Sequence, residues 1–282
     1  MFEFKKIGLI GLGLIGGSLG LEVKKKKIAE IIFGFSRSLE TMEKAIKRGI
    51  VDKYFEKPEN LIKEVDFLIL ATPISALEEY FKIIKKIRPE ILFTDVSSVK
   101  KSVCLKVNRI IGKNANFIGS HPISGSEKSG VDFAREGLFE DKIVVLTPTE
   151  NTKEEVTEKV RYFWERLGSK IIFMSPEKHD KVFGFTSHLP HFLVYTLLYL
   201  GSKNKENIKN CFGSGFLDTT RIGKSSPEMW TEIFMENKKN ILFWTEKFEN
   251  ELKILKKFLR NGKDENIREI LTKSKNYREE LE

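Results

Sequence analysis

A glycine-rich turn near the start of the chain limits its fold more than any other feature. An apolar run, KIGLIG at residues 6–11, leads directly into Gly-Leu-Gly-Leu-Ile-Gly at 11–16. In this spacing the first glycine permits a tight turn, the second lets the backbone approach a pyrophosphate, and the third lets the next helix pack closely on the strand. The amino end of that helix favours bound phosphate. The stretch therefore predicts a dinucleotide-binding unit, with contacts from Gly11, Gly13, Leu14, Ile15 and Gly16.

Further short apolar runs alternate with helical patterns through the first 175 or so residues. The runs lie at 31–35, 66–72, 91–96, 116–121, 142–148 and 170–174. They are continuous rather than alternating in character, which is typical of strands buried on both faces of a parallel sheet. Strand and helix in repeated alternation predict an α/β fold, with a Rossmann-type, doubly wound and mostly parallel sheet over residues 1–175.

The pattern changes to helices after residues 174–180. We expect residues 176–282 to form a separate all-α domain. A helix expected at 229–259 carries more Phe, Ile, Leu and Trp than a single exposed helix needs. It is therefore expected to be buried or to lie between subunits, which predicts a homodimer formed through the helical domain.

Composition narrows the class of protein. The chain has 282 residues and a net charge of +9, but much of its lysine lies in solvated runs, and no nucleic-acid recognition motif accompanies them. The charge suits small anionic ligands better than nucleic acid. No stretch approaches the roughly 20 apolar residues that span a bilayer. The glycine-rich first 20 residues lack a signal-peptide cleavage site. We expect a cytoplasmic protein.

Metal binding is not indicated. Cys104 and Cys211 lie far apart and form no CxxC motif or Cys/His cluster. Two of the four histidines, His188 and His191, lie three residues apart in TSHLPH, but no third ligand is near them in the sequence. We expect no metal, and instead a helix that begins near Ser187.

The residues after the second run bear on the choice of cofactor. An acidic residue there would bind the ribose hydroxyl of NAD, but Ser36 and Arg37 occupy the position. A hydroxyl and a guanidinium suit the 2′-phosphate of NADP. The residues favour NADP and leave NAD as the alternative. Thr72 and Pro73, at the end of the run 66–72, are further candidates for cofactor binding.

Two segments that follow strands are candidates for chemistry. Ser97, Ser98 and Lys100 follow the run at 91–96, and His121 ends the run at 116–121. Ligands of open α/β sheets bind beyond the carboxyl ends of the strands. A histidine there can take a proton from a substrate hydroxyl while hydride leaves the same carbon.

Five motifs together resemble one family, in order, over about residues 6–240. They are GLIGLGLIGGSLG, DVSSVK, GSHPISGSEKSGV, HDKVFGFTSHLPH and FLDTTRIGKSSPEMWTEIFMEN. This combination resembles the prephenate/arogenate dehydrogenase family of tyrosine biosynthesis. The resemblance implies a Rossmann-type domain followed by a helical dimerisation domain, in agreement with the boundary near residue 175.

The resemblance also implies roles for individual residues. His121 matches the catalytic histidine, and Ser98 a serine that hydrogen-bonds near it. Arg221 matches an arginine that binds a substrate carboxylate, and His191 a histidine that contacts the substrate side chain. The other matches are a gating acid and positions in or beside the substrate pocket: Glu127 with Ser126 beside it, Ser187, His188, Asp180, Asp218 and Trp230. Leu217 stands before Asp218 where some relatives have a basic residue, which puts electrostatic gating by that loop in doubt.

The activity implied is oxidative decarboxylation of prephenate to 4-hydroxyphenylpyruvate and CO2 with NAD(P). Arogenate, or both substrates, is a close alternative, and the second histidine of SHLPH favours prephenate. A β-hydroxyacid dehydrogenase is more distant, because that class uses a lysine in its helical domain and the helix after TSHLPH has none before Lys203. A non-enzymatic nucleotide-binding scaffold would leave His121, His191 and Arg221 without a role.

Overall fold

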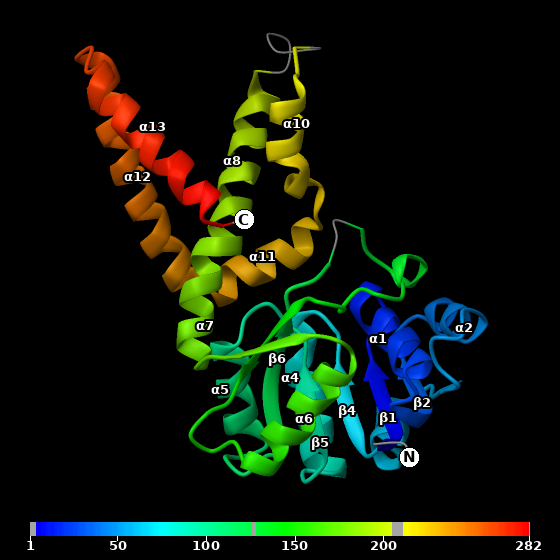
Figure 1. Ribbon diagram of the computed structural model, residues 1–282. Helices are drawn as coiled ribbons and strands as arrows, with labels where there is room; N and C mark the ends of the chain where they lie inside the picture. Colours follow the sequence, from blue (N-terminus) through cyan, green and yellow to red (C-terminus); the bar gives the residue numbers. More distant parts are fainter. Residues whose placement is uncertain (1–3, 126–127, 205–210, 282) are drawn as a thin grey trace. The chain divides into compact units, whose positions relative to one another are not determined.

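The computed structural model describes residues 4–125, 128–204 and 211–281. The chain forms two compact units, Met1–Asn237 and Lys238–Glu282, which we describe separately (Figure 1). The first unit holds the sheet and every residue predicted to serve the site. The division into domains at residue 175 stays a prediction.

A single eight-stranded sheet organises the first unit. Its strands are β1 (Phe4–Ile10), β2 (Ala29–Phe35), β3 (Lys53–Tyr54), β4 (Phe67–Leu70), β5 (Leu92–Asp95), β6 (Phe117–Pro122), β7 (Ile143–Thr147) and β8 (Lys170–Phe173). Their order is β3-β2-β1-β4-β5-β6-β7-β8, with Ile7 beside Ile32 on one side and Phe67 on the other. The chain leaves β1 toward β2 and β3, and later crosses to β4 on the opposite side. This reversal between β1 and β4 is the point where doubly wound sheets bind ligands.

The predicted α/β class and mostly parallel sheet are confirmed, with one departure at the edge. β7 runs antiparallel to β6, and β8 runs parallel to β7. Between β6 and β7 the described residues hold only a short 3-10 turn, η1 (Val131–Phe133), and no α-helix. A parallel return needs a crossover of a dozen or more residues, usually a helix, so this connection allows an antiparallel neighbour. The two-residue strand β3 has no counterpart among the predicted runs.

Helices cover the sheet and continue after it. Those between strands are α1 (Leu14–Lys25), α2 (Leu39–Lys47), α3 (Pro58–Glu64), α4 (Ile74–Ile87), α5 (Lys101–Ile110) and α6 (Glu154–Arg166). After β8 come α7 (Pro176–Phe183), η2 (Gly184–His188), α8 (Leu189–Lys203), α10 (Ser214–Thr220), η3 (Arg221–Lys224) and α11 (Pro227–Glu236). The second unit consists of α12 (Lys238–Arg260) and α13 (Asp264–Glu279).

The segment TSHLPH lies in a helix that does not begin at Ser187. Helical conformation runs without interruption from α7 through η2, a π-type turn, into α8. Pro190 has no backbone N–H, and its ring would clash with the carbonyl group four residues earlier in a regular α-helix. A wider turn relieves such a clash, and π-turns often mark functional sites. Ser187, where a helix was predicted to begin, therefore lies inside this π-type turn of a longer helical segment.

The helix expected at 229–259 is two helices. α11 ends at Glu236 and α12 begins at Lys238. Between them the Asn237 side chain donates to the Asp180 carbonyl oxygen at 2.8 Å and lies 2.9 Å from His188 Nδ1. The amide is thus engaged by the helical segment of residues 176–188, which an apolar pattern does not reveal.

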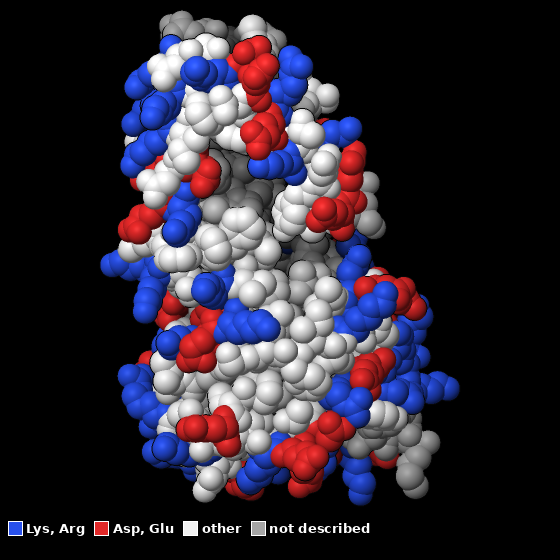
Figure 2. Space-filling model, turned by 60° about the vertical axis from the view of Figure 1, so that its left-hand side comes forward, with Lys and Arg blue, Asp and Glu red and all other residues white. Residues whose placement is uncertain are grey.

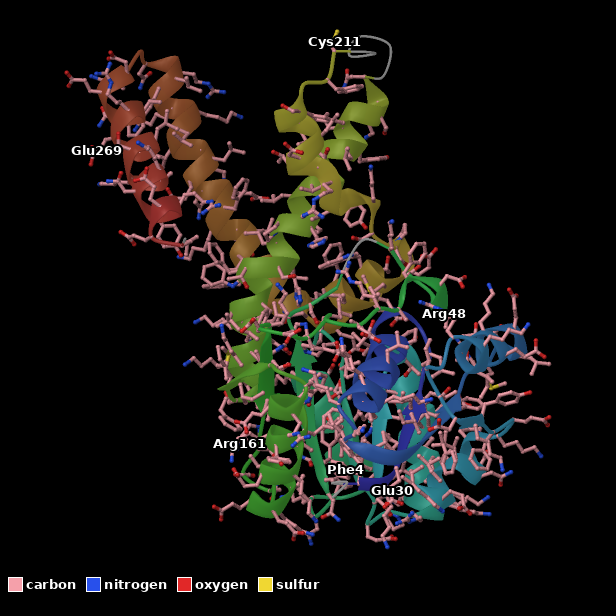
Figure 3. All side chains as sticks on the ribbon, turned by 45° about the vertical axis from the view of Figure 1, so that its right-hand side comes forward. Phe4, Glu30, Arg48, Arg161, Cys211 and Glu269 are labelled. Atoms are coloured by element: carbon pink, nitrogen blue, oxygen red, sulfur yellow. The ribbon has the colours of Figure 1, made fainter. Side chains whose placement is uncertain are left out.

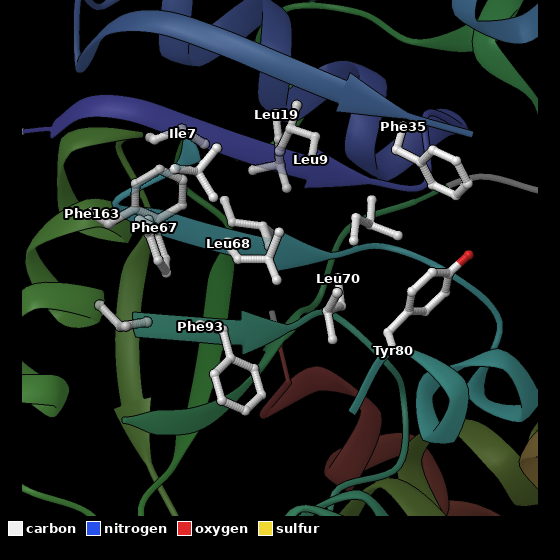
Figure 4. Close-up of a cluster of buried hydrophobic side chains, with 14 of the residues drawn as sticks. Ile7, Leu9, Leu19, Phe35, Phe67, Leu68, Leu70, Tyr80, Phe93 and Phe163 are labelled. Carbon is white, nitrogen blue, oxygen red and sulfur yellow. The ribbon is translucent and has the colours of Figure 1, made fainter. Parts of the chain in front are cut away.

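The core lies against the sheet (Figure 4). Phe67 on β4 stacks on Phe4 with ring centroids 5.1 Å apart and meets Phe163 of α6 edge-on at 5.1 Å. The next residue, Trp164, donates from Nε1 to Ser120 Oγ at 3.0 Å. That hydroxyl lies 2.7 Å from Thr94 Oγ1, so α6 is tied to neighbouring strands β5 and β6 just below the carboxyl edge of the sheet.

The surface carries charges of both signs. On the face shown in Figure 2, Lys and Arg side chains lie among Asp and Glu. On that face the Lys and Arg side chains are not gathered in a single patch. None of the described helices is long and apolar enough to cross a membrane.

Candidate active site

A cavity of about 490 Å³ opens at the carboxyl ends of β1, β4, β5 and β6. Phe4 and Glu30, labelled in Figure 3, mark the opposite, amino ends of β1 and β2. The predicted residues that line the cavity are Gly13, Leu14, Ile15, Thr72, Pro73, Ser98 and His121. Two candidate sets, one for a dinucleotide and one for proton transfer, therefore share one cavity.

The glycine turn leaves room for a ligand at one position and none at another. Gly13 precedes α1, and a Cβ added to it would meet nothing within 4 Å. A Cβ on Gly16 would overlap the Gly11 carbonyl oxygen, so Gly16 is needed for the packing of the helix on the strand. The two glycines thus separate ligand approach from helix packing, as the motif predicts.

The polar groups around the turn suit a dinucleotide. Thr72 Oγ1 and Ser124 Oγ are buried without a hydrogen-bond partner among the described residues, and both residues line the cavity. Buried hydroxyl groups are normally paired, so these two are available to a bound molecule. The amino end of α1 adds backbone N–H groups suited to phosphate. Gly13, Leu14, Ile15 and Thr72 would hold the cofactor's phosphates and neighbouring groups.

Ser36 and Arg37 follow β2 directly but do not line this cavity. Arg37 is exposed, and its charge lowers the pKa of Tyr80, although burial raises that pKa more. The Tyr80 ring lies edge-on to Phe35 at 6.4 Å, at the end of the same strand. Ser36 and Arg37 are therefore accessible to a part of the ligand that extends beyond the glycine turn.

His121 ends β6 and is almost buried, with 9% of its surface exposed. Its Nδ1 lies 2.8 Å from His179 Nε2, and His179 Nδ1 lies 2.8 Å from Asp180 Oδ1. Asp180 also accepts from the backbone N–H groups of Lys100 at 2.8 Å and Lys101 at 3.0 Å. Because Nδ1 of His121 is engaged in this chain, its Nε2 is the nitrogen left for a substrate.

Burial and neighbouring basic groups keep His121 neutral. Loss of solvent lowers its pKa well below the ordinary value, and His179, Lys100 and His188 lower it further. Lys100 is fully buried, where Nζ donates to Asp95 Oδ2 and, at 2.7 Å, to the Ser120 carbonyl oxygen. A neutral imidazole at the cavity wall can act as a general base.

The other two histidines have different surroundings. His188 is fully buried, does not line the cavity, and has its pKa lowered to about 4 by burial. His191 is half-buried and donates from Nδ1 to the Ser187 carbonyl oxygen at 2.9 Å. Its ring stacks on Trp230, with centroids 3.5 Å apart. Ser187, His191 and Trp230 thus form one cluster, and none of the three lines the cavity.

Several predicted residues lie apart from the cavity wall. Asp180 is buried beneath His121, whereas Asp218 and Arg221 are exposed on α10 and η3. Arg221 stands four residues before Ser225, the first cavity-lining residue of that segment. Ser126 and Glu127 lie outside the described residues.

The structure adds residues that the motifs did not single out. His179 contacts His121 although the two are 58 positions apart in the sequence. Its cues in the sequence are that it is one of four histidines and that it opens the motif HDKVFGFTSHLPH, directly before Asp180. The segment before and along α11 also lines the cavity, and Glu232 accepts from Ser75 N and Oγ at 3.1 and 2.5 Å. No group of three potential metal-ligating side chains is found within the part of the chain that the structure describes.

The two glycines make a matched test. Gly13→Ala should weaken dinucleotide binding at least about tenfold, because its Cβ enters the space that a phosphate needs, with little change in thermal stability. Gly16→Ala should lower the unfolding temperature, because its Cβ overlaps the Gly11 carbonyl oxygen. Fluorescence titration with NADH and NADPH, together with thermal unfolding, separates the two effects. Equal loss of stability in both variants would contradict this assignment.

The buried histidines predict acid sensitivity. His121, His179, His188 and His191 all have lowered pKa values, with burial as the largest cause. Below the ordinary pKa of about 6.5 the unfolded chain binds protons that the folded chain excludes, so the free energy of unfolding falls as the pH falls. With a folded pKa of about 4, His188 alone accounts for roughly 3 kcal/mol by about pH 4.

Denaturant unfolding between about pH 6.5 and pH 5 measures that slope. His188→Asn should reduce it by close to one proton, whatever the variant's absolute stability. An unchanged slope would show that His188 takes up a proton in the folded state.

Comparisons with known proteins agree with this geometry. A family model described as the prephenate dehydrogenase nucleotide-binding domain matches residues 19–173, and the prephenate dehydrogenase dimerization domain matches 175–273. Prephenate dehydrogenase of Bacillus subtilis is 34% identical over 281 residues, covering 97% of this chain and 75% of that protein.

Two solved structures are similar over nearly the whole chain. Prephenate dehydrogenase of Aquifex aeolicus, in complex with hydroxyphenyl propionate and NAD+, has a TM-score of 0.92 and 35% identity, covering 99% of this chain and 98% of that one. Arogenate dehydrogenase of Synechocystis has a TM-score of 0.83 and 30% identity, covering 98% of this chain and 100% of that one. The predicted family and the predicted oxidoreductase class are confirmed. This chain belongs to the prephenate dehydrogenase family of nicotinamide-dependent oxidoreductases.

Proposed function

We propose that this protein converts prephenate to 4-hydroxyphenylpyruvate and CO2. The observation that carries the proposal is His121, a neutral and nearly buried base in the same cavity as the glycine turn. Prephenate is a cyclohexadienol with a hydroxyl on one ring carbon and a carboxylate on the opposite quaternary carbon. Loss of hydride and of the hydroxyl proton gives a ketone, which takes up the electron pair released as the ring carboxylate leaves as CO2. The ring then becomes aromatic, and the resulting phenolate oxygen takes back a proton, which the protonated His121 can return, to give the phenol of the product.

The chain's own groups supply the proton acceptor and the orientation. When bound, a nicotinamide dinucleotide accepts the hydride. His121 Nε2 takes the hydroxyl proton, and Ser98, also at the cavity wall, orients the hydroxyl. Positioning of the reacting groups provides much of the rate, and a general base typically adds about 10²–10⁴-fold.

Cations near the cavity would hold the substrate carboxylates. Lys128 lines the cavity, with Nζ 5.2 Å from the centre of the Phe133 ring. We assign Arg221 to a carboxylate and His191, on Trp230, to the substrate side chain. The assignments of Ser187, Asp218, Ser126 and Glu127 to substrate binding rest on the family resemblance, as does that of His188, which is buried away from the cavity and could act on the substrate only indirectly.

We also propose NADP as the preferred cofactor. Ser36 and Arg37, rather than an acidic residue, directly follow β2, and the exposed Arg37 guanidinium suits a 2′-phosphate. NAD is the alternative, which the Aquifex complex with NAD+ favours.

A homodimer completes the proposal. The match to a dimerization domain supports it, as do exposed apolar side chains within the helical segment. They include Leu197, Tyr199 and Leu200 on α8 and, in the second unit, Leu242, Phe243, Phe248, Leu252 and Leu259 on α12.

Steady-state kinetics with prephenate and arogenate, each with NAD+ and NADP+, tests the function. We expect the highest kcat/KM with prephenate and NADP+. His121→Asn should lower kcat by about 10²–10⁴-fold, with little change in cofactor binding, because it removes the base and keeps the cavity. An active His121→Asn enzyme would overturn the mechanism.

Two controls sharpen this experiment. Arg221→Ala should raise KM for prephenate far more than Lys224→Ala, a cation on the same turn. Equal effects would mean that Arg221 acts only through the general charge of the segment. Sedimentation of the same preparation shows whether the active species is a dimer.

A further inference from the structure

A buried hydrogen-bonded chain leads away from the catalytic base. It runs from His121 Nδ1 to His179 Nε2 at 2.8 Å, and from His179 Nδ1 to Asp180 Oδ1 at 2.8 Å. His179 and Asp180 are nearly or fully buried and do not line the cavity, so neither can touch a substrate there. Proton transfer by His121 alone does not require either of them.

At Asp180 the direction of hydrogen-bond donation is fixed. Both Asp180 oxygens accept from backbone N–H groups, Oδ1 from Lys100 and Oδ2 from Lys101. A backbone N–H can only donate, which holds the carboxyl group as an ionised acceptor. The bond from Asp180 Oδ1 to His179 must therefore use a proton on His179 Nδ1.

The protons on both rings follow from that constraint. A neutral His179 with its proton on Nδ1 has a bare Nε2, which can only accept. His121 must then donate from Nδ1, which leaves its own Nε2 bare. The reverse arrangement would put the proton on His121 Nε2 and would need a donor at the position of the Asp180 carboxylate.

We propose that His179 and Asp180 are positioning residues that hold His121 in the tautomer with a bare Nε2 toward the cavity. This inference rests on the proposed function, in which that nitrogen accepts the hydroxyl proton of the substrate. The Asp-His pair of serine proteases acts on a single imidazole in the same sense. Here a second imidazole stands between the carboxylate and the base.

The other groups around the two rings do not set the tautomer. Lys100 Nζ is engaged by Asp95 and the Ser120 carbonyl oxygen. His188 Nδ1 is engaged by Asn237. The Phe183 ring packs against both imidazoles, with centroids 4.9 Å from His121 and 4.6 Å from His179, and offers no hydrogen bond of this kind.

The hydrogen-bonded series from His121 to Asp180 also matters after the substrate proton has moved to His121. A protonated His121 donates from Nδ1 to His179, and the negative charge of Asp180 lies at the far end of the chain. Charge-assisted hydrogen bonds are stronger than neutral ones, so the pair stabilises the product of proton transfer more than the resting state. This difference lowers the barrier as well as selecting the tautomer.

Nitrogen-15 NMR of the free enzyme with labelled histidine tests the tautomer directly, because only four imidazoles contribute. The signals of His121 are identified by their loss in His121→Asn. We expect Nδ1 protonated and Nε2 bare in the wild type. In His179→Leu, His121 should lose this single tautomer, and kcat should fall by about 10²–10⁴-fold with KM for prephenate nearly unchanged.

Two further variants distinguish positioning from packing. Gln at position 179 can still accept from His121 Nδ1, so His179→Gln should recover most of the lost activity and the wild-type tautomer. Phe183→Leu changes the packing beside both rings and keeps the hydrogen bonds, so the His121 tautomer should stay as in the wild type.

Three results would overturn the inference: a proton on His121 Nε2 in the wild type, an unchanged tautomer in His179→Leu, or no recovery in His179→Gln. Failure of the proposed function is a separate outcome. A wild-type enzyme without activity on prephenate would refute the function, whereas the NMR result needs no substrate.

Discussion

The Asp180 carboxylate joins parts of the chain that lie 80 residues apart in sequence, and the site depends on this contact. It receives the backbone N–H groups at the start of α5 and the ring of His179 on α7. The hydrogen bonds from the backbone N–H groups fix α7 against the segment that follows β5, beside Ser97 and Ser98. The hydrogen bond from the His179 ring aligns His179 with His121 at the end of β6. One ionised group thus sets both the distance between sheet and helix and the orientation of the base.

Burial of neutral imidazoles has opposing effects on stability and catalysis. Desolvation lowers the pKa of His121, which keeps the ring unprotonated at neutral pH but weakens it as a base. The hydrogen-bonded chain to Asp180 offsets part of that loss, because its carboxylate favours the protonated product. At His188 burial lowers the pKa to about 4, although the nearby Asp180 charge raises it, and the ring makes no hydrogen bond to that carboxylate in the described contacts. Burial thus lowers the pKa of both rings, and they differ in their partners: His121 is hydrogen-bonded to His179, and His188 to Asn237.

The sequence predicted local features well and contacts between distant segments poorly. The glycine turn, the long strands and His121 at the end of a strand follow from composition and spacing over a few residues. The direction of β7 depends on a connection without a helix, and the end of α11 depends on the bonds of Asn237 to residues near 180 and 188. The partner of His121 lies 58 residues away, and no periodicity joins the two. Such features require the folded arrangement.

The histidines of TSHLPH show why spacing alone misleads. His188 and His191 are three positions apart, a spacing that places side chains on one face of a regular helix. The wide turn ends at His188, and Pro190 follows it. His188 is held by Asn237 in the interior, whereas His191 lies on Trp230 and is half-exposed. The two rings have separate partners and different exposure, so they serve separate purposes. His188 secures the junction between α7 and the end of α11, and His191 is the one that retains a surface for a ligand.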